Sequence, residues 1–182
     1  MRVLAVIGIL AILAAVGAAI FFFGGFYNVA ANAPDPGAIK WALEEIRDAS
    51  IGRRANFAAP TDLDDPGTVQ AGARAFSQRG CAICHGAPGV KSPDFYKGMN
   101  PDPPDLKDVV EESEPAELFW AIKNGIKMTG MPSFGAIGMD DKEIWAVVAF
   151  LRKLPTVSDA DYKTWTGGQS AAALGAAAHG PH

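Results

Sequence analysis

Two cysteines and a histidine form the part of this sequence that is best suited to chemistry. Cys81 and Cys84 are the only cysteines in the chain, and His85 directly follows the second of them. Cysteines at this spacing occur in redox-active dithiols, in zinc sites and in sites of covalent haem attachment. These three kinds of site make different demands on the rest of the sequence.

The residues around the motif distinguish between the three kinds of site. A structural zinc site needs four Cys or His ligands, and the other two histidines, His179 and His182, lie in the last few residues. A dithiol of the thioredoxin kind is expected to follow a β-strand, and no strand pattern precedes Cys81. Two thiols in a tight turn can reach the two vinyl groups of a haem, and the next residue then lies under the ring. The sequence therefore predicts one covalently bound haem c, attached through Cys81 and Cys84, with His85 bound to its iron.

The elements that must position this motif are all predicted to be helical. One helix begins at Asp65-Pro66, a cap followed by a proline at the first helical position, and ends at Gly80. Residues 86–110 are rich in Gly and Pro and are predicted to lack regular structure. Further helices are predicted over residues 115–124 and from Asp140 to Pro155, the second with a capping box that uses Glu143, and a weaker turn over residues 158–165. The predicted fold class is all-α.

The second axial ligand of the iron is expected to be a methionine. The candidates are Met99, Met128, Met131 and Met139, or a histidine of the C-terminal tail, whose Gly- and Ala-rich sequence makes it a poor candidate. Met131 lies in a Gly- and Pro-rich loop between two predicted helices, whereas a methionine within a helix more often fills a core. Met128, three residues earlier, is the alternative. A thioether opposite His85 would raise the reduction potential relative to two imidazoles and would close the sixth coordination position.

The order of these features resembles the class I cytochrome c family. The similarity covers about residues 66–154 and follows one sequence of motifs: a helix with Gly72 and Phe76, then Cys81 to His85, Pro104-Asp105-Leu106, Met131-Pro132, and a last helix with Trp145. The resemblance implies that the first and last helices of the domain cross closely at Gly72. It also implies that the iron ligands are His85 and Met131.

The resemblance suggests further contacts around the haem. A backbone carbonyl, that of Pro104, would accept a hydrogen bond from the other ring nitrogen of His85, although the adjacent Pro103 leaves the register open. Trp120, Phe134 and Trp145 either line the haem or pack in the core.

The N-terminal segment predicts a transmembrane helix. Residues 3–23 carry no charged side chain, and a helix of this length spans the roughly 30 Å hydrocarbon core of a bilayer. The alternative is a signal peptide cleaved near Ala31-Asn32-Ala33. The predicted organisation is an anchor (1–27), a periplasmic linker with a short amphipathic helix (28–65), a haem domain (66–165) and a flexible tail (166–182). Arg2, before the span, and the covalent haem both favour the bacterial inner membrane, with the haem domain in the periplasm.

Charge and ligation together predict an electron carrier rather than an enzyme. The formal net charge of −4 argues against nucleic-acid binding. Residues 102–117 hold seven carboxylates and one lysine, while Lys91, Lys97, Lys123 and Lys127 lie near the haem motif and the Met131 loop.

The expected partners are redox proteins: a dehydrogenase or quinol-oxidising complex as donor, and a terminal oxidase as acceptor, with no small-molecule substrate. The protein would be a separate carrier or a haem subunit of such a complex. The alternative function is a peroxidase or a gas sensor with an open haem site.

Overall fold

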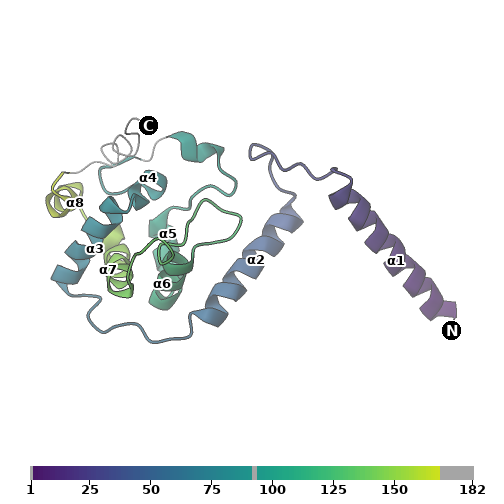
Figure 1. Cartoon of the computed structure of the whole chain (residues 1–182), viewed down its shortest axis with the longest axis horizontal. Helices are drawn as coiled ribbons and strands as arrows, with labels where there is room; N and C mark the ends of the chain where they lie inside the picture. The colour runs from purple at the N-terminus through teal and green to yellow at the C-terminus, as the bar shows by residue number, and fades with distance from the viewer. Residues whose placement is uncertain (1, 92–93, 169–182) are drawn as a thin grey trace. The chain divides into compact units, whose positions relative to one another are not determined.

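The structure is a computed structural model that describes residues 2–91 and 94–168 (Figure 1). The chain divides into two compact units, residues 1–34 and residues 35–182. The described part of the first unit is mainly α1 (Arg2–Phe23). This helix is long and apolar enough to cross a membrane, with a mean hydropathy of 2.9, although a signal sequence has the same properties.

The second unit is helical throughout its described residues, with no strand beyond an isolated bridge between Ala87 and Val90. This agrees with the predicted all-α fold class. Its elements are α2 (Gly37–Arg54), α3 (Pro66–Gln78), α4 (Cys81–His85), the 3₁₀ helix η1 (Asp94–Gly98), α5 (Leu106–Glu112), α6 (Pro115–Asn124), α7 (Asp141–Lys153), the 3₁₀ helix η2 (Leu154–Thr156) and α8 (Asp159–Thr166).

Side-chain caps fix where the main helices begin. The Asp65 carboxylate accepts a hydrogen bond from the Thr68 amide at 2.8 Å, and the Asp140 carboxylate accepts one from the Glu143 amide at 2.8 Å. Each cap satisfies an amide that has no partner within the helix, which stabilises the helix by about 1 kcal/mol. The predicted starts of α3 and α7 are confirmed.

Two sequence-based predictions about local structure were wrong. Residues 86–110 were expected to be irregular, but α5 begins at Leu106 because Asp105 caps it through the Lys107 amide at 2.9 Å. Glu143 was expected to close a capping box at α7. Its carboxylate instead binds the Arg79 guanidinium at the end of α3, with two contacts of 2.6 and 2.7 Å. The ion pair with a distant residue replaces the local hydrogen bond.

The core of this unit is built on the crossing of α3 and α7, which lie side by side in Figure 1. A Cβ atom at Gly72 would overlap the Ala146 carbonyl group and would lie 2.9 Å from Phe150 Cβ. The close approach lets Phe76 pack against Phe150, with ring centroids 5.3 Å apart. Both rings are fully buried, and each such burial contributes about 2–3 kcal/mol.

The helix α8 extends this core beyond η2. Its Tyr162 is buried and stacks on Phe150 with ring centroids 5.7 Å apart. Ser158 caps the helix through the Asp161 amide at 3.1 Å. The flexible tail predicted for residues 166–182 lies, from residue 169 on, outside the described residues, as do His179 and His182.

Candidate haem site

The helical turn α4 carries the two cysteines and the histidine on one face. Gly80 separates it from α3 and adopts φ 79°, a left-handed conformation that favours glycine. Cys81, Cys84 and His85 stand at positions i, i+3 and i+4, which are neighbours on a helix surface. Ala82, between them, is 2% exposed and holds the turn against the core. The fold therefore presents two thiols and an imidazole in one direction.

The properties of the thiols argue against a redox dithiol. Burial raises the pKa of the Cys81 thiol to about 12, so it stays protonated at neutral pH. A catalytic dithiol works as a thiolate and needs a lowered pKa.

The donor set also argues against zinc. Within residues 2–91 and 94–168, no three His, Cys, Asp or Glu side chains are arranged to hold a metal ion. Two thiols beside a histidine fit a haem attached through thioether bonds.

The orientation of His85 leaves one ring nitrogen for a metal. Its Nδ1 lies 3.2 Å from the Pro104 carbonyl oxygen. Because a carbonyl can only accept, Nδ1 carries the proton, and Nε2 of the neutral ring keeps a lone pair. Burial lowers the pKa of His85, although the bond to Pro104 acts in the opposite direction. The neutral imidazole, which is the form that binds iron, is therefore favoured.

The position of the Pro104 carbonyl follows from the cap of α5. Pro104 directly precedes Asp105, whose carboxylate accepts from the Lys107 amide, and the buried Leu106 ties this helix start to the core. The sequence left open whether Pro103 or Pro104 would face His85. The tertiary structure brings the Pro104 carbonyl to the ring, and the unpredicted α5 is the reason.

Met131 lies in a loop that is fixed against the end of α6. Its carbonyl accepts from the Ile126 amide at 3.2 Å, and its amide donates to Thr129 Oγ1 at 3.1 Å. Gly125 ends α6 with φ 68°, and a Cβ there would lie only 2.7 Å from the carbonyl carbon of Pro132. The loop can pack so closely only because residue 125 is a glycine.

Comparison with protein families agrees with this geometry. Residues 67–151 match the family described as "Cytochrome C oxidase, cbb3-type, subunit III". Residues 67–151 belong to the class I c-type cytochromes. The cytochrome domain thus has a haem c electron-transfer role, with haem bound covalently. No curated protein and no solved structure matches the chain.

The other methionines of the cytochrome domain have distinct surroundings. Met128 is 92% exposed, with φ 60°, and Met139 is buried in the core at 3% exposure. Met99 is half-buried, and its side chain lies against Gly130, where an added Cβ would overlap it. Met131 is half-buried and packs at the edge of the core. The exposed fraction of the side chain therefore distinguishes Met131 from Met128, the alternative ligand.

Sequence reasoning missed two hydroxyl groups that hold the Met131 loop. Thr129 Oγ1 donates to the Ile126 carbonyl at 2.8 Å, and Ser133 Oγ donates to the Lys123 carbonyl at 2.7 Å. Ser133 Oγ also accepts from the Ala136 amide at 3.2 Å. Ser and Thr next to Gly or Pro are a known turn signal, so these residues could have been noted. Their partners are set by how the loop folds back on α6.

Trp145 packs mainly against other aromatic rings. It stacks on Phe119 with ring centroids 4.3 Å apart, and Phe57, from the connector before α3, meets it edge-on at 6.2 Å. This arrangement favours the core-packing interpretation for Trp145. Phe134 is also buried, at 6% exposure, and Trp120 is half-buried.

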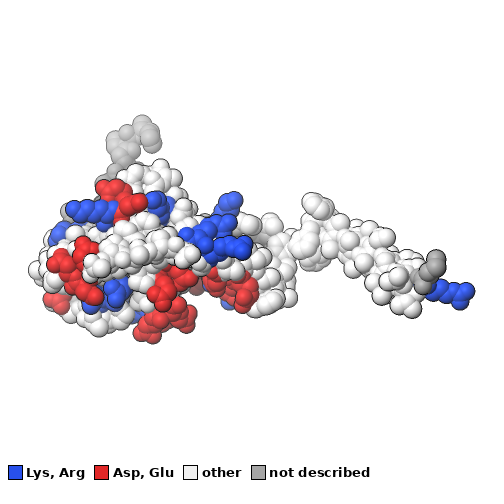
Figure 2. Space-filling model, turned by 90° about the horizontal axis from the view of Figure 1, so that it is seen from below, with Lys and Arg blue, Asp and Glu red and all other residues white. Residues whose placement is uncertain are grey.

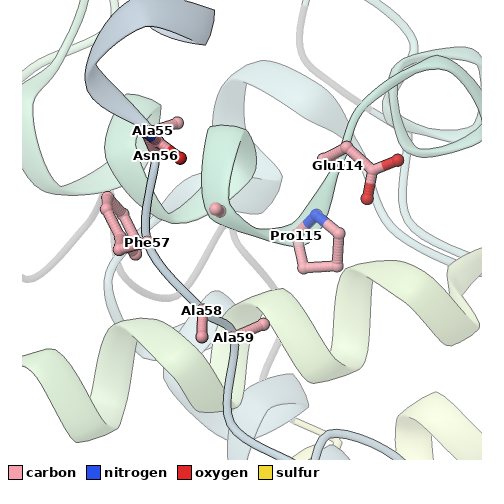
Figure 3. A pocket seen from close by; sticks show the side chains of 8 residues that line it. Ala55, Asn56, Phe57, Ala58, Ala59, Glu114 and Pro115 are labelled. Atoms are coloured by element: carbon pink, nitrogen blue, oxygen red, sulfur yellow. The ribbon is translucent and has the colours of Figure 1, made fainter.

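A cavity of about 440 Å³ has no residue of α4 in its lining (Figure 3). The connector residues Phe57, Ala58 and Ala59 line one side, and Glu114 and Pro115 at the start of α6 line the other. Apart from Glu114 and the amide of Asn56, its lining holds only hydrocarbon side chains. We therefore regard the surface at α4, and not this cavity, as the functional site.

The lysines near the candidate site differ in their pairing. Lys123 binds Asp141 at 2.6 Å and Lys97 binds Asp94 at 2.7 Å. Lys91 and Lys127 are exposed and form no ion pair with another residue that the structure describes. The contact with Asp94 raises the pKa of Lys97. Basic and acidic side chains both occur on the face seen in Figure 2, where several lie side by side. The surface thus offers charges of both signs to a partner.

Proposed function

We propose that this protein is a membrane-anchored c-type cytochrome with one haem that transfers single electrons on the periplasmic side of the bacterial inner membrane. Its donor would be a dehydrogenase or a quinol-oxidising complex, and its acceptor a terminal oxidase. The protein serves either as a separate carrier or as the haem subunit of such a complex. The match to a family described by an oxidase subunit supports partners of this kind.

The observation that carries the proposal is the geometry of α4. Two thiols and an imidazole share one face of a single helical turn. The Pro104 carbonyl oxygen accepts a hydrogen bond from His85 Nδ1 at 3.2 Å. This arrangement directs Nε2 to a metal while the thiols remain available for thioether bonds. It is the arrangement that covalent haem attachment requires.

Each residue has a separate part in the proposed mechanism. A bound haem supplies one-electron exchange between ferric and ferrous iron. Cys81 and Cys84 would hold the haem by carbon–sulfur bonds, so that it would not dissociate. His85 Nε2 would bind the iron, with its ring held by Pro104. Met131 Sδ would be the second protein ligand, would favour the ferrous state and would keep small molecules from the iron.

Replacement of Met131 tests this assignment. We expect Met131→Ala to abolish the weak long-wavelength band of the ferric protein that reports sulfur–iron coordination. We also expect a lower reduction potential and carbon monoxide binding to the ferrous protein, because one thioether accounts for all three properties. Absorption spectroscopy and a potentiometric titration measure them.

Met128→Ala is the matched control, since it removes the same side chain from an exposed position three residues away. It should leave the band, the potential and carbon monoxide binding unchanged. If Met128→Ala changes these properties and Met131→Ala does not, the ligand is Met128. If native ferrous protein binds carbon monoxide at neutral pH, the alternative function of a peroxidase or gas sensor gains support.

A further inference from the structure

One surface of the second unit is not explained by the proposed electron transfer. Within α2, Ile39, Leu43 and Ile46 follow the spacing i, i+4 and i+7, which places them on one face of the helix. Ile39 is half-buried, Leu43 is 50% exposed and Ile46 is 65% exposed. Trp41, which lies on the other side of the helix, is 63% exposed. We call Ile39, Leu43 and Ile46 the apolar face of α2.

The apolar face points away from the cytochrome domain. A Cβ at Gly52 would lie 3.3 Å from Glu117 Oε1 of α6, and Ala55, the C-cap, is buried. Gly52 is nine residues after Leu43, and Ala55 is nine residues after Ile46. Nine residues make two and a half helical turns, so the contacts with the domain lie on the opposite side of α2.

The two ends of α2 are both held on the domain. Asp35, just before the helix, accepts a hydrogen bond from Asn100 Nδ2 at 3.3 Å, and Gly52 lies beside Glu117 at the other end. The helix is therefore not a free linker. Whatever binds its apolar face also fixes the orientation of the cytochrome domain.

Charges are sorted around α2 in the pattern of a helix that lies on a membrane surface. Arg53 continues the apolar stripe seven residues after Ile46, and Arg47 and Arg54 flank it. Asp48, nine residues after Ile39, lies on the opposite side, and its carboxylate accepts two hydrogen bonds from the Arg47 guanidinium, at 2.7 and 3.1 Å. Basic side chains beside an apolar face suit anionic lipid headgroups, and acidic ones turned away from it avoid them.

The chain also keeps α2 close to a bilayer. Residues 24–36 separate α1 from α2, and thirteen residues reach about 45 Å at full extension. A tether of this length gives α2 a high effective concentration at the surface, so three aliphatic side chains can suffice for binding.

We propose that the apolar face of α2 lies on the membrane surface, in contact with anionic lipid. The cytochrome domain then keeps one orientation towards the membrane while it diffuses laterally. This orientation places it beside membrane-embedded redox partners. This proposal rests on the proposed membrane anchor but not on the assignment of the iron ligands.

Spin labels on the full, haem-loaded chain in lipid nanodiscs test the proposal. Because both native cysteines are used in haem attachment, a label at Ile46→Cys or at Asp48→Cys is unique. In discs containing phosphatidylglycerol, we expect lipid-soluble oxygen to relax the label at position 46 more than a water-soluble nickel complex does. The label at position 48 should show the reverse. In discs of phosphatidylcholine alone, the preference for oxygen at position 46 should be weaker.

Equal exposure of both labels to the nickel complex would overturn the proposal. A label at position 46 that becomes immobile only when a membrane redox complex is added would assign the face to a protein and would also overturn it. If α1 did not anchor the chain, the chain would separate from the discs during gel filtration. This result would distinguish a missing anchor from the two outcomes above. Failure of the haem assignment would appear only in the Met131 experiment.

Discussion

The crossing of α3 and α7 and the Met131 loop are both close contacts that depend on a glycine, but they are held in different ways. At the crossing, Gly72 lets α3 approach the Ala146 carbonyl, and fully buried rings fill the space around it. At the loop, Gly125 lets residues 131–133 pack against the end of α6. Hydrogen bonds from hydroxyl and amide groups then fix the loop at the half-exposed edge of the core.

Because of this difference, substitutions at the crossing should change the stability of the domain, whereas substitutions at the loop should change the proposed iron ligation. The crossing is maintained by buried apolar area, which contributes to the free energy of unfolding of the whole domain. The loop is maintained by a few polar contacts, each with a net contribution of about 1 kcal/mol. Changes at the crossing should therefore unfold the domain, whereas changes at the loop should mainly move Met131.

The largest effect is expected for Gly72→Ala. Its added Cβ would overlap the Ala146 carbonyl, and two packed helices must move apart to accommodate it. We expect the free energy of unfolding to fall by about 3 kcal/mol. Urea unfolding of the haem-loaded protein, followed by circular dichroism, measures the change.

Gly52→Ala is the control for this experiment. It is also a glycine in a helix, but its added Cβ meets only the end of the Glu117 side chain, at 3.3 Å. We expect no loss, or a gain of up to about 1 kcal/mol from helix propensity. If both variants lose the same stability, the close approach at Gly72 is not what limits the crossing.

An intermediate effect on stability and a large effect on ligation are expected for Gly125→Ala. The left-handed φ of 68° and the 2.7 Å approach to Pro132 both disfavour a side chain. We expect the free energy of unfolding to fall by about 2 kcal/mol and Met131 to leave its proposed position on the iron. Carbon monoxide binding to the ferrous variant would report this displacement, and a variant that excludes carbon monoxide would contradict it.

The smallest effect is expected for Ser133→Ala. The hydroxyl donates to the Lys123 carbonyl, but that carbonyl also accepts from the Gly135 amide at 3.0 Å and does not lose its last partner. We expect a cost of about 0.5–1 kcal/mol and a slightly faster exchange of Met131 for added imidazole. Stopped-flow absorbance measures this exchange, and an unchanged rate would mean that Ser133 does not restrain the loop.

The sequence determined those features that depend on neighbouring residues alone. The caps at Asp65 and Asp140 set the starts of α3 and α7, since a capping side chain reaches only amides two or three positions ahead. The spacing of Cys81, Cys84 and His85 placed them on one face for the same reason. Through the family resemblance, Gly72 indicated that two helices cross closely at this position.

Only the tertiary structure decided the contacts between residues far apart in the chain. It paired Glu143 with Arg79 instead of with its own helix start, formed α5 within a Pro-rich segment, and brought the Pro104 carbonyl, not that of Pro103, to His85. It also left Met128 exposed and Met131 against the core. Periodicity and capping describe a few successive residues, whereas these contacts depend on which surfaces the packed helices bring together.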